Sequence, residues 1–449
     1  SGESYSPGRL QEGMYGIAWA LTKGVTSYND LDVTGNWVKG FQAWKQYGLY
    51  PTHYGYPRYG PTFGLWPSTF QYVMDYGTAY DSSTTESKYT QYLINTIVQG
   101  NNNSFVNSTY LSDIAIRLDP NAPTSDYRVQ PTQYVFSANS RAVPLTFGWP
   151  NPATWRGDAF ISRTGWSSTS DTHVWYGSKT LGPSDHETVP QAGDLQVWKA
   201  GNYLLGNDNT PTTDFNESVA GPYLEFGGAT SYRGGIGSGN GPAVAVITRW
   251  AGTQPYGDAN SNYVYALSDL AGAYTTTLTR AVRHVIHFKK AGREEIIVTF
   301  ADVASATPII IRDQVFYPMN SEAAYTGPNG ITNAAEGATS YPGSGGCASL
   351  DTNRVVLTQQ DGSSGGGPTP LPGTSQPTRQ YNLITKFLSP GTITLNCDGS
   401  AVGVPSGASG YTGSTGHAER VSIYGGSSVG GTSTTLEHIA IHKIATHPD

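Results

Sequence analysis

The sequence has few charged residues and no excess of positive charge. Asp, Glu, Lys and Arg make up only 13% of its 449 residues, and the formal net charge is −7. Because no basic stripe is present to meet phosphate groups, we expect no nucleic-acid partner. No apolar run reaches the roughly 18 residues of a membrane-spanning helix, so we expect no membrane span either.

Cysteine is scarce as well. The two cysteines, Cys347 and Cys397, form no CxxC pair or Cys/His cluster of the zinc-finger type. They are compatible with one disulfide in an oxidising compartment and equally with two buried thiols. Low lysine content, abundant Ser, Thr, Gly and Tyr, and a first residue other than Met indicate a processed, exported protein. We expect it to be secreted, or to lie at the cell surface or in the periplasm.

Several common catalytic motifs are also missing. No Gly-x-Ser-x-Gly motif lies in the strand–turn–helix context of a serine hydrolase. The Gly-rich segment 233–241 lacks the Lys-Ser/Thr and the following helix of a phosphate-binding loop. No Asp/Glu pair is marked by its local context for glycoside hydrolysis. These three classes of enzyme are therefore not indicated.

Aromatic residues, by contrast, are abundant. Thirty tyrosines and ten tryptophans are typical of strands and of surfaces that bind ring-shaped ligands, because each ring joins a large apolar area to a polar handle. Over roughly the first 125 residues, apolar periodicity predicts helices at 10–22, 34–47 and 86–99. The Pro-containing segment 118–123 is the expected linker to the rest of the chain.

The pattern then changes to short strands separated by Gly, Pro, Asn and Ser turns. Evenly spaced strands without helical periodicity are typical of an antiparallel β-sandwich. We therefore expect an α+β fold, with a helical region at 1–125 and a large antiparallel β-sandwich at 126–449. The predicted strands are 159–163, 172–177, 194–205, 243–250, 262–268, 277–289, 294–302, 307–316, 353–358, 380–387, 391–396, 419–424 and 436–444.

The most informative stretch runs from residue 160 to residue 208. It carries the pair Asp185-His186 among aromatic-rich strands, and the segment 191–198 (QAGDLQVW) follows as part of a hairpin-like unit. Histidine is the side chain best suited to proton transfer near neutral pH. A histidine that is merely hydrogen-bonded at a strand end is the alternative interpretation of His186.

The order of features in and around this stretch resembles the heparinase II/III-like polysaccharide lyases. The resemblance rests on segments 163–166 (RTGW), 185–198, 263–274 and 279–283, and it covers roughly residues 100–445. That family joins a helical toroid to a C-terminal β-sandwich, so the resemblance implies a shortened toroid in the N-terminal region. It also implies cleavage of a uronate-containing polysaccharide by β-elimination, with Tyr and His as acid–base groups.

The resemblance suggests two catalytic residues. His186 is the first, either neutralising the sugar carboxylate or transferring a proton. Tyr15 is the second, because Glu12-Gly13-x-Tyr15 resembles the toroid segment that carries the family's catalytic tyrosine. A tyrosine held near a cation can act first as a base and then as an acid. A core tyrosine in a helix is the alternative interpretation of Tyr15.

The sequence departs from the family's His-x-His-x-Asp-Ala-Gly motif at two positions. Thr188 stands at the position of the second His, and Gln191 stands in place of the Asp. His186 and Asp208 alone would supply too few ligands for a metal ion. We therefore expect no cofactor, and a structural divalent metal is the weaker alternative.

The aromatic loop between the first helices supplies further candidates. His53 is a third catalytic candidate, and Arg58 can pair with a sugar carboxylate through its bidentate guanidinium group. Solvated loop residues are the alternative interpretation of both. Sugar rings stack on aromatic faces, which makes the loop aromatics candidate substrate-binding residues. These are Tyr54, Tyr56, Tyr59 and Trp66.

Three functions remain open at this point. A polysaccharide lyase is preferred, with an acidic polysaccharide as its partner. The altered His motif suggests a catalytically silent carbohydrate-binding relative instead. The low charge and the shortened helical part suggest a structural or assembly protein of a surface layer or filament. A homo-oligomer or another partner would then cover the apolar helix faces.

Overall fold

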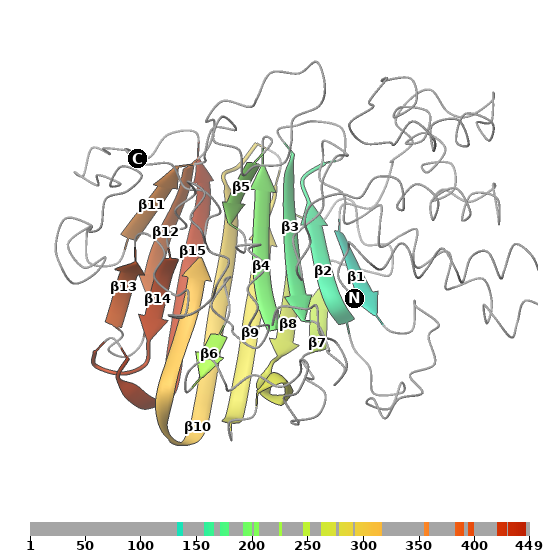
Figure 1. The fold of residues 1–449 in the computed structure, drawn as a ribbon. Helices are drawn as coiled ribbons and strands as arrows, with labels where there is room; N and C mark the ends of the chain where they lie inside the picture. The colour runs from blue at the N-terminus through green and yellow to red at the C-terminus, as the bar shows by residue number, and fades with distance from the viewer. Residues whose placement is uncertain are drawn as a thin grey trace, which may run out of the picture.

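The computed structural model of the 449-residue chain describes the strands of its C-terminal two thirds. The described residues are 133–137, 157–165, 171–178, 192–199, 202–205, 224–226, 246–251, 262–274, 278–290, 292–316, 354–358, 382–389, 394–398, 420–428 and 430–445. Figure 1 shows two stacked groups of antiparallel strands. The predicted helical region 1–125 lies outside the described residues.

One layer contains the longest strands and is called the long-strand layer below. Its order is β7-β8-β9-β10-β15-β12-β11, with every neighbouring pair antiparallel. The bounds of these strands are β7 (Val246–Ala251), β8 (Tyr263–Asp269), β9 (Leu278–Phe288), β10 (Glu295–Phe316), β11 (Arg354–Thr358), β12 (Asn382–Leu388) and β15 (Thr432–Ala445). A short 3₁₀ helix, η5 (Ala271–Ala273), follows β8.

The facing layer covers the inner side of the long-strand layer. Its strands β1, β2, β3, β4 and β5 pair in chain order, and β2 joins β7 through the pair Gly157 and Ile247. The bounds of these and the remaining facing strands are β1 (Gln133–Ser137), β2 (Gly157–Arg163), β3 (Thr172–Ser178), β4 (Ala192–Lys199), β5 (Asn202–Leu205), β6 (Leu224–Phe226), β13 (Thr394–Asp398) and β14 (Arg420–Tyr424).

Strand β10 belongs to both layers. Its first part pairs with β9 and β15, and its last residues pair with β6 and β14. Between Ala304 and Ile309 the register with β15 shifts, because β10 has more residues there than its partner. Such extra residues bend a strand, and Pro308 fits this place because proline is confined to irregular positions of a sheet. The bend, visible at the bottom of Figure 1, carries Asp313 over the inner face of the long-strand layer.

The inner face of the long-strand layer alternates polar and apolar rows across its strands. Strand register aligns Ser268, Arg283, Ala301 and His438 in one row, and Val264, His287, Ile297, His442 and Thr385 in another. Between them lies a row with Ala266, Val285, Thr299, Ala440 and Phe387. All these side chains are buried, so the sandwich interior combines an apolar core with two layers of polar residues.

The strand predictions agree closely with the structure. The prediction of a large antiparallel β-structure is confirmed, and each predicted strand corresponds to an observed one. Three details differ. Strands β1 and β6 were not predicted, and β4 and β5 divide the predicted strand 194–205. The predicted strands 294–302 and 307–316 are the two parts of β10.

Candidate functional site

A buried ion cluster lies beneath the start of β4. Asp313 Oδ1 accepts a hydrogen bond of 3.2 Å from Arg283 Nη2, and its Oδ2 lies 2.6 Å from His438 Nε2. Arg283 Nη1 also donates a 2.8 Å bond to the carbonyl oxygen of Gly193. The side chains of Arg283, Asp313 and His438 are fully buried. The cluster therefore joins β9, β10, β15 and β4 across the interior.

This cluster fixes the end of the segment that carries His186. Residues 179–191 connect β3 to β4, and Gly193 is the second residue of β4. The φ of Gly193 is +84°, a left-handed conformation that favours glycine. A Cβ atom at this position would approach Leu270 Cδ1 to 2.9 Å. Both the backbone and the packing therefore require glycine at the base of this connection.

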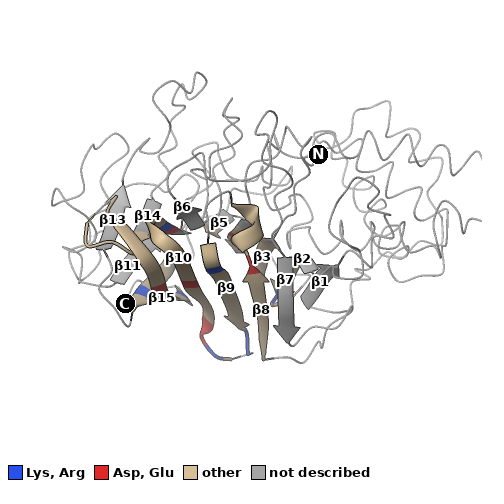
Figure 2. Cartoon of the chain, turned by 90° about the horizontal axis from the view of Figure 1, so that it is seen from below, with Lys and Arg blue, Asp and Glu red and all other residues tan. Residues whose placement is uncertain are grey.

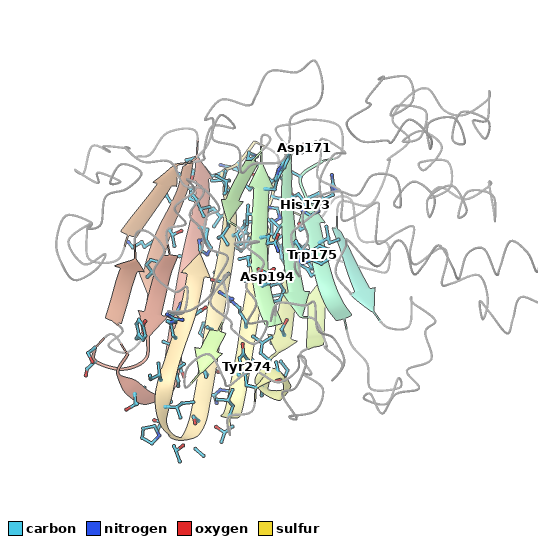
Figure 3. All side chains as sticks on the ribbon, viewed as in Figure 1. Asp171, His173, Trp175, Asp194 and Tyr274 are labelled. Atoms are coloured by element: carbon cyan, nitrogen blue, oxygen red, sulfur yellow. The ribbon has the colours of Figure 1, made fainter. Side chains whose placement is uncertain are left out.

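Asp194, the next residue along β4, has an unusually high pKa for a carboxyl group. Figure 3 labels Asp194 on β4. Its Oδ2 accepts a 2.5 Å hydrogen bond from Gln196 Nε2, and the side chain is fully buried. Burial raises the pKa of Asp194 to about 7, while the bond from Gln196 and the charge of Arg283 lower it only partly. The carboxyl group therefore stays protonated through most of the acid range.

A second polar network crosses the interior around Glu295. Glu295 Oε2 accepts hydrogen bonds from Thr172 Oγ1 at 2.7 Å and from Lys199 Nζ at 3.1 Å. Its Oε1 lies 2.8 Å from His287 Nε2, and His287 Nδ1 lies 2.7 Å from Ser162 Oγ. The network thus connects β2, β3 and β4 of the facing layer to β9 and β10.

The charges in this network shift the acidities of its members. Burial alone would raise the pKa of Glu295, but its bond to His287 and the charge of Lys199 lower it to about 2. Burial lowers the pKa of His287, against the raising effect of Glu295. His442 is similar, since burial and the charge of Arg283 lower its pKa to about 3. At neutral pH we therefore expect an ionised Glu295 and an uncharged His442.

The hydrogen-bonded side chains of Ser162, His287 and Glu295 are of the types that form a nucleophilic triad, but they are not accessible to a substrate. Ser162 and His287 have no exposed surface, and Glu295 is held by two further donors. A substrate cannot reach the Ser162 hydroxyl group in this arrangement. The network therefore holds the layers together and does not form a nucleophilic site.

None of the residues predicted for the active site lies in the described part of the chain. This holds for the catalytic candidates His186, Tyr15 and His53, and for the substrate-binding candidates Arg58, Tyr54, Tyr56, Tyr59 and Trp66. It holds also for the altered motif positions Thr188 and Gln191, for Asp208, and for Cys347 as a partner of Cys397. What the structure adds is the scaffold on both sides of the segment 179–191.

Within the described strands and turns, no group of three or more His, Cys, Asp or Glu side chains could hold a metal ion. In the same residues, no helix has the length and apolar character needed to cross a membrane.

Sequence reasoning missed the buried clusters that hold this scaffold. Arg283, His287, His438 and His442 occupy inner positions of strands that alternate with apolar outer positions. A strand with charged residues at every second position is normally assigned a solvent-facing polar side. Several partner residues lie 90 to 125 positions away, as for Arg283 with Gly193, His287 with Ser162 and His438 with Asp313, so no local signal identified these contacts.

The described strands define a class of fold. It is a two-layer antiparallel β-structure whose interior is crossed by charged clusters and in which β10 passes between the layers. Neither a protein-family model nor a curated protein sequence matches this chain. Comparison with solved structures does give matches.

The chain is structurally similar to heparinase III. The crystal structure of heparinase III matches with a TM-score of 0.55 and 10% identity, covering 99% of this chain and 54% of that one. Heparan sulfate lyase HepC from Pedobacter heparinus matches with a TM-score of 0.47 and 10% identity, over 90% of this chain and 45% of that one. The chain thus spans about half the length of the structures it matches. The resemblance inferred from sequence is confirmed at the level of the fold.

Proposed function

We propose that this protein is an exported polysaccharide lyase that cleaves an acidic, uronate-containing polysaccharide by β-elimination. The observation that carries the proposal is the similarity in fold to heparinase III over 99% of the chain. The neighbouring structure's name supplies the substrate class to test first, which is heparin and heparan sulfate. Because the identity is only 10%, the activity itself rests on the residues named below.

β-Elimination requires three functions from the protein. The carboxylate of the uronate must be neutralised, the C5 proton must be removed, and the leaving O4 must be protonated. In our proposal His186 neutralises the carboxylate or transfers a proton, and Tyr15 acts as base and then acid. Arg58 and His53 assist substrate binding and proton transfer, and the aromatic loop stacks on sugar rings.

The described strands bound the segment that carries His186. Its segment leaves β3 at Ser178 and enters β4 at Ala192, beside the anchored Gly193. Proton transfer needs a donor and acceptor held within hydrogen-bond reach.

The test is ultraviolet absorbance from the new C4–C5 double bond. The full chain is incubated with heparan sulfate, heparin, hyaluronan, alginate and polygalacturonate. We expect a rise with one of these polymers, lost in His186→Gln and Tyr15→Phe. Ser427→Ala, in an exposed turn that follows β14, is the control, because Ser427 is not among the residues proposed to bind or react with the polymer.

The same experiment separates the alternatives. Binding of a polymer without any absorbance would replace the lyase with a carbohydrate-binding relative, as the altered His motif suggests. If no polymer binds or reacts, both polysaccharide functions fail, and a structural or assembly role gains support.

A further inference from the structure

The outer face of the long-strand layer is unusual for a sheet face that meets solvent. Along β8, β9, β10 and β15 every second residue points outward, as the alternating burial shows. Register aligns these outward residues in four rows: Tyr263, Phe288, Ile296 and Lys443; Tyr265, Ile286, Val298 and Ile441; Leu267, His284, Phe300 and Ile439; Asp269, Val282, Asp302 and Glu437. We call these sixteen residues the outer array.

The outer array is apolar over most of its area. Tyr263 is 52% exposed and Phe288 is 41% exposed, and Leu388 on β12 extends the third row with 40% exposure. The other apolar members are partly exposed. A solvated sheet face normally presents polar side chains. A contiguous apolar patch of this kind marks an interaction surface.

The centre of the outer array is already ordered. Tyr265 Oη and His284 Nδ1 lie 2.9 Å apart, and the ring centroid of His284 lies 5.1 Å from that of Phe300. These contacts restrict the side-chain rotamers of three neighbouring strands. A partner would therefore meet a surface that loses little conformational freedom on binding.

The two ends of the outer array carry opposite charge. Three cations lie at one end, Lys290 and Arg293 in the β9–β10 turn and Lys443 on β15. A single acid, Glu294, accompanies them, and its Oε1 lies 2.6 Å from Lys443 Nζ. Figure 2 shows the Lys and Arg colour on this turn. The other end carries three acids, Asp269, Asp302 and Glu437, and one cation, Arg280, which pairs with Asp302 and Glu437. One end is thus cationic and the other acidic.

We propose that the outer array is the interface between two copies of this chain. A two-fold axis lying in the interface, perpendicular to the strands, places the first row of one copy opposite the fourth row of the other. The cationic end then meets the acidic end, and Lys443 on β15 faces Glu437 of the second copy. Such a self-complementary patch is what a two-fold dimer requires. Aligned packing of two sheets about 10 Å apart is a common arrangement.

The size of the array agrees with a dimer of moderate affinity. Four strands about 4.8 Å apart and rows about 6.8 Å apart give roughly 500 Å² per copy, or about 1,000 Å² in total. Specific interfaces begin at about this total.

A polysaccharide is the competing occupant, and the array fits it less well. The pair Tyr263 and Phe288 is tilted by 39°, and His284 and Phe300 are tilted by 56°, so the rings form no flat platform. Apart from Tyr265, branched aliphatic side chains, which offer no face for stacking, make up the rest of the apolar area.

Sedimentation velocity of the full chain over a concentration series tests the proposal. We expect a monomer–dimer equilibrium in the wild type. Val298→Lys places a charge at the centre of the array and should raise the dissociation constant by about 100-fold or more. Ser427→Lys adds the same charge in an exposed turn outside the array and should leave the dissociation constant unchanged.

A charge exchange tests the two-fold arrangement itself. Lys443→Glu and Glu437→Lys should each weaken the dimer by about 10-fold, because each places like charges face to face twice. Mixing the two variants should restore dimers, since every facing pair is then of opposite sign. Circular dichroism of each variant checks that the fold is kept.

Three results would overturn the proposal. One is a wild-type chain that stays monomeric at the highest concentration reached. Another is a dimer that Val298→Lys leaves intact. The third is a mixture of the two charge variants that remains as monomeric as its components. Polysaccharide binding that Val298→Lys abolishes in a monomeric protein would assign the array to the polymer instead.

Discussion

The two faces of the long-strand layer differ from the usual arrangement of a β-sheet, because the inner face mixes polar with apolar residues and the outer face is mostly apolar. On β9 the inner positions include Arg283 and His287, whereas the outer positions include Ile286 and Phe288. The buried polar residues meet partners within the interior, such as Gly193 and Asp313 for Arg283 and Ser162 for His287, whereas the apolar outer residues form the surface that we proposed a second copy covers. On these strands the hydrophobicity of a residue therefore does not by itself decide whether it faces the interior, because a polar residue with a buried partner can also be inside.

The largest expected effect on stability comes from removing a buried ion pair on the inner face. Asp313→Ala leaves Arg283 buried without its carboxylate, and we expect the free energy of unfolding to fall by about 3–5 kcal/mol. Asp302→Ala removes an acid paired with the half-exposed Arg280 on the outer face and should cost about 1 kcal/mol or less. Urea unfolding of both variants makes the comparison. Equal losses would contradict the difference drawn between the faces.

The pH dependence of stability tests the burial of His442 on the inner face. His442 has a folded pKa of about 3, against 6.5 when unfolded, so the unfolded chain binds the proton more readily. Stability from this residue is therefore present above pH 6.5 and is lost as the pH falls toward 3, by about 2–4 kcal/mol. His442→Gln should flatten the dependence of the unfolding temperature over that window. An unchanged slope would show that His442 titrates normally.

Asp194 acts in the opposite direction over part of the same range. Its folded pKa is raised from 3.8 to about 7, so its contribution is greatest below pH 3.8 and falls as the pH rises to 7. The comparison of His442→Gln with the wild type cancels this contribution, because Asp194 is present in both.

A glycine substitution tests the anchor of the His186 segment. Gly193→Ala forces a left-handed conformation and a close approach to Leu270, so we expect a loss of about 1–3 kcal/mol. Gly292→Ala, in the exposed β9–β10 turn, has a similar φ of +72° and nothing within 4 Å, and it should cost less. Thermal unfolding measures both. Under the proposed function, Gly193→Ala should also lower lyase activity more than Gly292→Ala does.

The smallest effect is expected on the outer face. Tyr265→Phe removes one partly exposed hydrogen bond to His284 and should change stability by about 1 kcal/mol or less. Differential scanning calorimetry at a concentration below the dimer range measures this change. A loss as large as that of Asp313→Ala would mean that the outer face belongs to the folded core.

The sequence by itself determined the strands and the class of fold. Alternating patterns and turn residues located nearly every strand, because side-chain period and turn chemistry are local properties. The exceptions are informative. Strand β6 has only three residues, too short to show a period, and β10 was read as two strands because Ser305, Ala306, Thr307 and Pro308 form its bend. The resemblance to a lyase family was also readable from sequence, in the residues around His186.

Only the tertiary structure decided which side of each long strand is buried and what holds it there. Arg283 meets Gly193 and Asp313, and Glu295 meets Thr172 and Lys199, through contacts between distant parts of the chain. An alternating strand looks the same in sequence whether its polar side faces solvent or a buried partner. The free energy of a buried charge depends on that partner, and the partner is supplied by the fold.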